Sequence, residues 1–150
     1  SVTALDISIE AGEMTAHNAK QNGLAVEAAQ ADVFDFLTDR DKKKEHSYDY
    51  IVLDPPAFTK SGKTVHEAFR GYKEINYRAM KILPRGGYLA TCSCSHFMGE
   101  ELFVKMVKEA ARDAGVTLRQ IEFRQQAPDH PILMTVPETY YLKFFLFQIV

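Results

Sequence analysis

The sequence has few cysteines and no long apolar segment, and these two absences exclude whole classes of protein. Two cysteines among 150 residues are too few for a disulfide framework, which favours a reducing, cytoplasmic setting. No stretch of about 18 apolar residues is present, as a membrane-spanning helix would require. The most apolar run, residues 144–147, has only the length of a strand. Since no signal peptide precedes the first strand-like segment, we expect neither a secreted nor a membrane protein.

An excess of charge of either sign is also missing. The chain carries 18 Lys and Arg against 20 Asp and Glu, which gives a net charge of −2 with histidine neutral. This balance provides no overall attraction to nucleic acid, so any contact with RNA or DNA must come from a local patch or from another domain. Hydrophobic residues make up 46% of the chain and charged residues 25%. This composition is enough for a core and excludes a disordered chain.

Strand-like and helix-like segments alternate along the chain. The expected strands are residues 2–5, 26–30, 48–53, 88–94, 117–123 and 140–150, and the expected helices are residues 9–22, 33–39, 66–83 and 99–114. Residues 39–47, with a run of three lysines, are expected to form a solvated loop. Regular alternation predicts an α/β fold with a mostly parallel sheet and helices on both faces. The last two strands have no helix between them, so we expect an antiparallel pair at one edge.

Polar or reactive residues follow each of the first four strands. They are Asp6, Asp32, Asp54 and Cys94. Because ligands of open α/β sheets bind beyond the carboxyl ends of the strands, this placement predicts a site there. Asp6 can accept hydrogen bonds from ribose hydroxyls, or it can be a capping or loop acid for the next helix, which Ser8 can equally cap. Asp32 can accept a hydrogen bond from an adenine amine, or it can simply cap the helix after it.

The segment from Asp54 to Phe58 is a rigid turn at the end of a strand. Pro55 and Pro56 fix φ and remove two backbone donors, which leaves carbonyl oxygens that can be aimed at an exocyclic amine or a flat base. Phe58 can then stack on that base. The alternative is a plain strand-ending turn with Phe58 in the core.

Cysteines and a histidine alternate in the strand that ends near residue 94. Cys92, Cys94 and His96 would share one face, which is compatible with a zinc site, but such a site lacks a fourth ligand in this sequence. Cys92 lies deeper in the strand and is expected to be a small buried hydrophobe. Cys94 lies at the strand end, where a thiolate can reach a substrate if its surroundings favour ionisation.

Three further polar residues are candidates for substrate contacts. Arg70 and Lys73, near the start of the helix at 66–83, can contact phosphates or simply form a solvated face. His130 lies in a rigid proline-containing loop and can act as an acid or base, or it can hydrogen-bond its own backbone.

Taken together, the motifs resemble one enzyme family. They are Asp54-Pro55-Pro56-Ala57-Phe58, Arg70-Gly71-Tyr72-Lys73-Glu74-Ile75-Asn76, Ser93-Cys94-Ser95, Asp129-His130-Pro131 and Tyr141-Leu142-Lys143, in that order. This combination resembles the S-adenosylmethionine-dependent methyltransferases of the RlmI type, which methylate cytosine C5 in large-subunit (23S) ribosomal RNA. The resemblance covers essentially the whole chain. It implies a class I, Rossmann-like sheet of seven strands with an antiparallel final pair.

The resemblance also implies roles for the residues at the strand ends. Asp6, with its neighbour Ile7, corresponds to the family's contact with the cofactor ribose. Asp32, with Val33, corresponds to the contact near the adenine. Asp54 corresponds to the motif after the fourth family strand, beside both cofactor and target base. Cys94 corresponds to the candidate nucleophile, and Pro55, Pro56, Phe58, Arg70, Lys73 and His130 are expected on the substrate side.

One departure from the family concerns the start of the chain. The family's first strand and glycine-rich cofactor loop, and its amino-terminal RNA-binding domain, have no counterpart here. We therefore expect residues 1–150 to be a carboxyl-terminal part of the catalytic domain. The missing strand would be central in the family sheet. Its absence would leave strand edges unpaired, which predicts a homo-oligomer or a swapped assembly.

The implied reaction is attack of the Cys94 thiolate on cytosine C6, with Asp54 on the N3/N4 edge of the base. Some RNA C5 methyltransferases carry a second cysteine where this chain has Ala57, so the final base must be another group. Two alternatives stay open. One is methyl transfer to an exocyclic base amine through the Asp-Pro-Pro motif, although Phe58 comes one residue late for that pattern. The other is a catalytically inert, oligomerising fragment.

Overall fold

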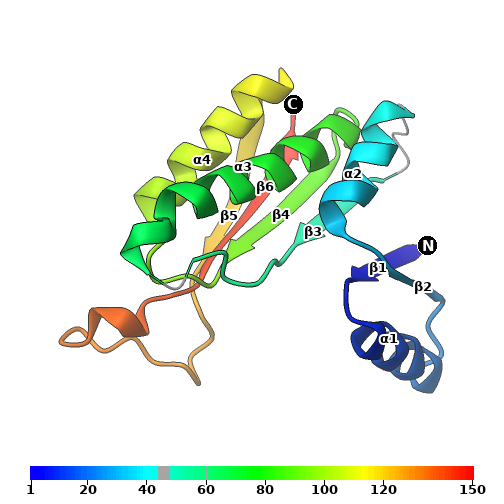
Figure 1. Ribbon diagram of the computed structural model, residues 1–150, viewed down its shortest axis with the longest axis horizontal. Helices are drawn as coiled ribbons and strands as arrows, with labels where there is room; N and C mark the ends of the chain where they lie inside the picture. The colour runs from blue at the N-terminus through cyan, green and yellow to red at the C-terminus, as the bar shows by residue number, and fades with distance from the viewer. Residues whose placement is uncertain (44–47, 60) are drawn as a thin grey trace. The chain divides into compact units, whose positions relative to one another are not determined.

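The structure, a computed structural model, describes residues 1–43, 48–59 and 61–150. The chain divides into two compact units, Ser1–Lys43 and Lys44–Val150, whose elements are labelled in Figure 1. Strands and helices alternate in the expected order. In the described ranges, no helix is long and apolar enough to cross a membrane.

The first unit is a two-stranded parallel sheet with two helices. Its elements are β1 (Val2–Asp6), α1 (Ile9–Gln21), β2 (Val26–Gln30) and α2 (Val33–Lys42). β1 and β2 pair in parallel from Val2 opposite Val26 to Asp6 opposite Gln30. α1 ends as predicted, because Gly23 adopts a left-handed φ of 65° directly after the helix, a conformation that glycine adopts without steric strain.

α2 is longer than the sequence pattern predicts. The expected helix stops at residue 39, whereas the observed one runs to Lys42, so the first part of the expected loop at 39–47 is helical. Asp39 and Lys43 form an ion pair of 2.8 Å at i,i+4 spacing, and the Arg40 guanidinium lies over the Phe36 ring. Such pairs along one helix face favour helix over coil. Residues 44–47, the rest of the predicted loop, lie outside the described residues.

The second unit is a four-stranded sheet with two long helices. Its elements are β3 (Tyr50–Leu53), η1 (Gly62–Thr64), α3 (Val65–Ile82), β4 (Tyr88–Ser93), α4 (Glu100–Ala114), β5 (Leu118–Arg124), η2 (Pro137–Thr139) and β6 (Lys143–Ile149). The strand order is β3-β4-β6-β5. β3 and β4 are parallel, whereas β6 is antiparallel to both of its neighbours. The predicted antiparallel final pair is thus confirmed.

Both long helices of this unit lie on one face of its sheet. Figure 1 shows α3 and α4 side by side in front of the strands. From β3 to β4 to β5 the chain steps across the sheet in one direction, and right-handed crossovers then place both helices on the same side. Helices on both faces, as expected from the sequence, are therefore not found within this unit. On the opposite face Tyr50 and Val52 are 49% and 61% exposed.

Aromatic side chains connect the helices to the sheet. Tyr72 of α3 and Phe103 of α4 are fully buried and meet edge to face, with ring centroids 5.9 Å apart. Phe103 in turn stacks on Phe145 of β6 at 5.9 Å. α3 and α4 present their apolar residues every three or four positions, and those residues are the buried ones. This packing fixes the carboxyl ends of β3 and β4, where the candidate chemistry lies.

Candidate active site

In the first unit, the two predicted cofactor carboxylates follow neighbouring strand ends. Asp6 is opposite Gln30 in the parallel register. Beyond that pair the Ala31 backbone N–H donates to the Asp6 carbonyl at 3.1 Å, and the Gln30 side chain donates to the Ile7 carbonyl at 3.2 Å. These bonds join the two loops that carry Asp6 and Asp32.

Both carboxylates stabilise the loops in which they lie. Asp6 Oδ1 accepts the Ser8 backbone N–H at 2.8 Å, while Ser8 itself caps α1. Asp32 caps α2, because its Oδ1 accepts the backbone N–H groups of Phe34 and Asp35. Asp6 therefore acts as a loop acid and Asp32 as a helix cap, as the alternative interpretations of these residues predict.

These roles still leave acceptor capacity at both positions. The local bonds use Oδ1 of Asp6 and Asp32, and both residues are exposed. Each Oδ2 can accept hydroxyl or amine donors, the groups that the ribose and adenine of a nucleoside cofactor present. Beside them Ile7 is 69% exposed, and Val33 is half-buried. The residues present thus fit a nucleoside, and their contacts with one stay predictions.

In the second unit, the loops that carry Asp54 and Cys94 lie together. The last residue of β3, Leu53, is opposite Thr91 of β4, so both strands end at the same edge. A hydrogen bond of 3.0 Å from Ser95 Oγ to the Thr59 carbonyl joins the two loops directly. The structure therefore brings together the two loops that carry the residues predicted to be catalytic.

The two cysteines have contrasting surroundings. Cys92 is 7% exposed, and burial raises its pKa to about 12, with further contributions from the charges of Asp54 and Cys94. Its predicted role as a buried small hydrophobe is confirmed. Cys94 is half-buried, and both thiols are free. Within the described ranges, no group of three or more His, Cys, Asp and Glu residues is placed to hold a metal ion.

A hydrogen-bond network holds the turn that carries Cys94. The hydroxyl of Ser93 donates to the Tyr72 hydroxyl at 3.1 Å and accepts the Ser95 backbone N–H at 3.3 Å. The Lys143 ammonium donates to the carbonyls of Ser95 and Tyr141, both at 2.6 Å. Sequence reasoning gave Ser93, Ser95 and Lys143 no role, although all three occur in the motifs that carry the family resemblance.

Phe58 packs against α3. Its ring centroid lies 4.6 Å from that of Tyr72, and a Cβ added at Gly71 would stand 3.3 Å from the ring. The glycine thus allows the close approach of the ring to the helix. This packing favours the alternative of a plain strand-ending turn with Phe58 directed to the core, although the residue is only half-buried. Pro55 is half-buried and Pro56 is exposed. Stacking of a base on Phe58 stays a prediction.

Lys73 is engaged in ion pairs between helices. Its ammonium lies 2.7 Å from Asp113 and 3.5 Å from Glu109, both on α4. The hydrogen bond with Asp113 raises the pKa of Lys73 and lowers that of Asp113. These contacts join α3 to α4 and give no support to a phosphate contact by Lys73. Arg70 is exposed and lines a shallow groove with Lys73 and Asp113.

His130 lies in the loop between β5 and β6. Its Nδ1 is 3.1 Å from the Asp129 carboxylate, and this hydrogen bond holds the pKa of Asp129 below its usual range. The side chain is 61% exposed, which leaves it accessible to a substrate. An acid–base role for His130 stays a prediction.

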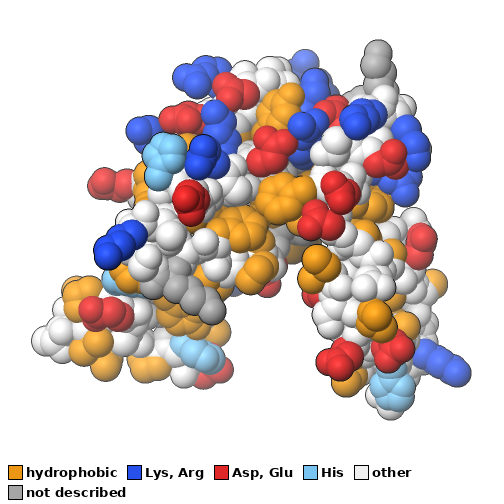
Figure 2. Space-filling view, in the orientation of Figure 1, with side chains coloured by type: hydrophobic (Ala, Val, Ile, Leu, Met, Phe, Trp, Pro, Cys, Tyr) orange, Lys and Arg blue, Asp and Glu red, His pale blue; other side chains and the backbone are white. Residues whose placement is uncertain are grey.

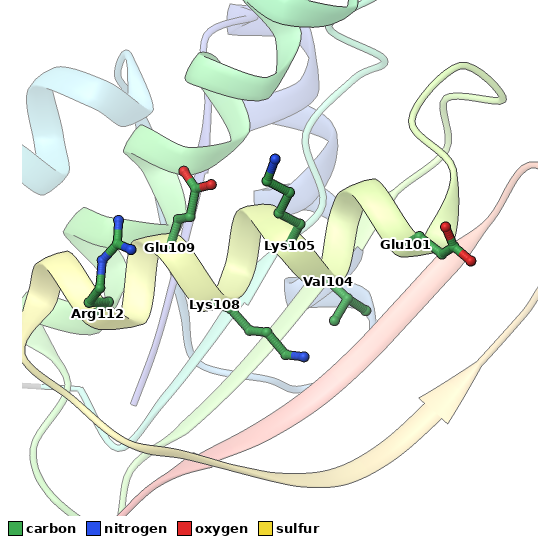
Figure 3. A pocket seen from close by; sticks show the side chains of 6 residues that line it. All are labelled: Glu101, Val104, Lys105, Lys108, Glu109 and Arg112. Carbon is green, nitrogen blue, oxygen red and sulfur yellow. The ribbon is translucent and has the colours of Figure 1, made fainter.

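An open groove along α4, drawn in Figure 3, is lined by side chains of that single helix: Glu101, Val104, Lys105, Lys108, Glu109 and Arg112. None of them is a predicted site residue. On the face drawn in Figure 2, basic and acidic side chains are interspersed over the helices.

Comparison with known proteins decides the family. The model of the methyltransferase small domain family matches residues 1–118. The chain belongs to this family. The resemblance inferred from the motifs is also confirmed, because curated relatives carry the name Ribosomal RNA large subunit methyltransferase I. The protein of Pseudoalteromonas atlantica is 44% identical over 95% of the chain, and that of Shewanella amazonensis is 45% identical over 95%.

The chain spans only part of these relatives. It covers 37% of the Pseudoalteromonas and Shewanella proteins. Among solved structures, NSun6 from Pyrococcus horikoshii, crystallised with SFG, matches with a TM-score of 0.68 at 19% identity, over 99% of this chain and 41% of its own. The NodS N-methyltransferase of Bradyrhizobium japonicum matches with 0.61 at 15% identity, over 98% and 65%. These likenesses show that the expected methyltransferase fold is correct.

Proposed function

We propose that this chain is part of an S-adenosylmethionine-dependent methyltransferase that methylates cytosine C5 in large-subunit ribosomal RNA in the cytoplasm. Residues 1–150 would form part of its catalytic domain. The names of the relatives support the reaction class and the RNA. The observation that carries the cytosine chemistry is Cys94, a half-buried free thiol in a turn joined to the Asp54 loop.

Cys94 would make C5 of cytosine nucleophilic. Its thiolate attacks C6, and the new S–C6 bond turns C5 into an enamine carbon. S-adenosylmethionine supplies the methyl group that C5 receives. A base then removes the C5 proton, and the S–C6 bond breaks to restore the aromatic ring and the thiolate. Ala57 excludes a second cysteine at that position as the base.

Asp54 and the first-unit carboxylates would position the reactants. Asp54, exposed at the end of β3, can accept a hydrogen bond from the N4 amine of the target base. Asp6 and Asp32 would hold the cofactor ribose and adenine through the oxygens that local bonds leave free. A carboxylate accepts hydrogen bonds without donating, which suits both roles.

The test uses the two cysteines as a matched pair in a full-length protein carrying this chain. We expect Cys94→Ala to abolish methylation of ribosomal RNA while binding of S-adenosylmethionine, followed by calorimetry, is retained. Cys92→Ala should keep activity, since this thiol is buried and protonated. Methylation by the Cys94→Ala protein would contradict the nucleophile role. Nucleoside analysis of digested RNA would then show whether an exocyclic amine receives the methyl group.

We also propose that the 150-residue chain self-associates. In the described ranges β1 pairs only with β2, and β3 pairs only with β4, so each sheet has a strand edge of the kind that pairs with another chain. Sedimentation of the chain should therefore show a dimer or larger species. A single monomeric species across the concentration range would contradict self-association. It would also count against the alternative that the chain is an inert, oligomerising fragment.

A further inference from the structure

A fully buried lysine lies beside the turn of the candidate nucleophile. Lys143 is 1% exposed, although lysine is among the residue types least often buried. Burying a charged ammonium is costly unless hydrogen bonds and charges compensate for it. The cost of burying Lys143 at the candidate site therefore suggests that this residue has a function there.

Lys143 contacts the residues on both sides of Cys94 in the sequence. In the antiparallel register, Lys143 is opposite Ser93, the residue before the cysteine. Its ammonium donates at 2.6 Å to the carbonyl of Ser95, the residue after it. A second bond of 2.6 Å, to the Tyr141 carbonyl, fixes the ammonium from its own strand. An ammonium has three donors, so these two bonds leave one N–H for another acceptor.

We propose that Lys143 is a positioning residue for Cys94: it holds the 93–95 turn and keeps a positive charge beside the sulfur, which favours the nucleophilic thiolate. This inference rests on the proposed role of Cys94 as nucleophile. Neighbouring cations are a common means of activating a cysteine. Removing the charge should therefore slow the chemistry of the sulfur itself, whatever the substrate.

The electrostatics of the turn agree with this geometry. Burial lowers the pKa of Lys143 to about 8, and the charge of Cys94 acts in the opposite direction and raises it. The ammonium form thus prevails at neutral pH. Tyr72 on α3, Cys92 on β4 and Asp54 after β3 are titratable groups that lie near this turn together with His96, which follows it, and none of them contributes to the pKa of Lys143.

The experiment measures alkylation of Cys94 by iodoacetamide in the folded 150-residue chain, followed by peptide mass spectrometry. Lys143→Met keeps the length and apolar stem of the side chain but removes the charge. We expect it to slow modification of Cys94 on the order of tenfold near neutral pH, because the thiolate is the reacting form. The difference should shrink above about pH 8, where the wild-type lysine also loses its charge.

Two controls separate charge from packing. Ser95→Ala removes the bond to Thr59 from the same turn but keeps the lysine. It should slow the reaction less than Lys143→Met does, and by the same factor at every pH, because it removes no charge. Cys92, which is buried, should stay unmodified in every variant. An equal slowing at all pH values, or the same slowing in Ser95→Ala, would mean that Lys143 acts only through structure and would overturn the proposal.

A reciprocal measurement covers the case in which Lys143→Met does not fold. If the two charges interact, Cys94→Ala must lower the pKa of Lys143, since coupling between two sites is mutual. The lysine ammonium can be titrated by NMR in both proteins, and an unchanged pKa would overturn the proposal. Both readouts concern the sulfur and the lysine alone, so a failed methylation assay would reject the proposed function without deciding this inference.

Discussion

The two units of the chain differ in how completely they bury their apolar residues. In the described part of the second unit, the core includes Tyr72, Phe103 and Leu89, each at 0% exposure. In the first unit the buried apolar residues are Ala19 and Leu37 alone, while Ile7 and Leu24 are 69% and 63% exposed. The unit that carries the predicted catalytic residues thus has a full core, whereas the unit that carries the predicted cofactor residues has little of one.

The difference follows from the helix sequences. α3 and α4 place large apolar residues on one stripe, so that packing on the sheet removes much apolar surface from water. α1 buries only Ala19, and a capping bond contributes typically about 1 kcal/mol. The well-packed core and the predicted cofactor contacts therefore lie in different parts of the chain, and this separation can be tested.

Hydrogen exchange should show the largest contrast. Amides of β4 and α4 are expected to exchange only through global unfolding, with an opening free energy of about 5 kcal/mol or more. Amides of α1 and β2 should open locally at a small fraction of that cost, because few buried contacts oppose it. The measurement is native-state exchange followed by mass spectrometry or NMR. Equal protection in both units would show that the first unit is stabilised by contacts beyond its own core.

Truncation of a core aromatic should give the next largest effect. We expect Phe103→Ala to lower the free energy of unfolding by about 3–5 kcal/mol, through lost burial and the cavity that remains. The matched control in the other unit is Leu24→Ala, where the side chain is 63% exposed and the change should stay within about 0.5 kcal/mol. Urea denaturation followed by circular dichroism measures both. A large loss in Leu24→Ala would contradict the contrast.

The pH dependence of stability should report the buried lysine. Below about pH 8 both the folded and unfolded states hold the Lys143 proton, so the cost of burying the charge is present in full. Between about 8 and the ordinary 10.5 only the unfolded state keeps it, and stability therefore rises with pH. Relative to Lys143→Met, the free energy of unfolding should increase by up to about 3 kcal/mol across this range.

Comparing the wild-type chain with Lys143→Met also cancels the effect of Cys92 on the pH dependence of stability, which has the opposite sign. The raised pKa of Cys92, about 12, stabilises the folded state at low pH, and this stabilisation is lost as the pH rises above 9.0. Because both proteins contain Cys92, its effect cancels in the difference. Denaturant unfolding at a series of pH values gives the slope, and a flat difference would show that the lysine is not buried in its charged form.

Local sequence patterns predict most elements and the strand-end residues of the site. The apolar spacing predicts a helix at 66–83, and α3 spans Val65–Ile82. Strand β6 is shorter than expected, beginning at Lys143 and not at residue 140. Its pairing with β4 ends at Lys143 opposite Ser93, and its pairing with β5 ends at Phe144 opposite Arg124, so residues 140–142 have no strand partner in the described part of the chain.

Long-range partners account for what the sequence does not reveal. The bonds from Ser95 to Thr59 and from Lys143 to Ser95 join residues 36 and 48 positions apart. The acidic partners of Lys73 likewise lie on another helix. The sequence alone therefore suggests a phosphate contact for Lys73, whereas the structure shows it in ion pairs. Candidate ligand-binding residues can be named from their place at a strand end. The side chains that hold the loops around them, such as Ser95 and Lys143, can be identified only from the complete fold.

The smallest expected effect separates the two roles of Asp32. The side chain caps α2, so Asp32→Ala should lower the free energy of unfolding by about 1 kcal/mol, while Asp32→Ser keeps a capping oxygen and should lower it less. If Asp32 also accepts a hydrogen bond from the cofactor adenine, both variants must weaken binding of S-adenosylmethionine, because neither has a free carboxylate oxygen. Calorimetric titration of the 150-residue chain measures this binding, and full affinity in Asp32→Ser would leave capping as the function of this residue. Saturable binding by the wild-type chain would in turn show that the first unit holds a cofactor despite its small core.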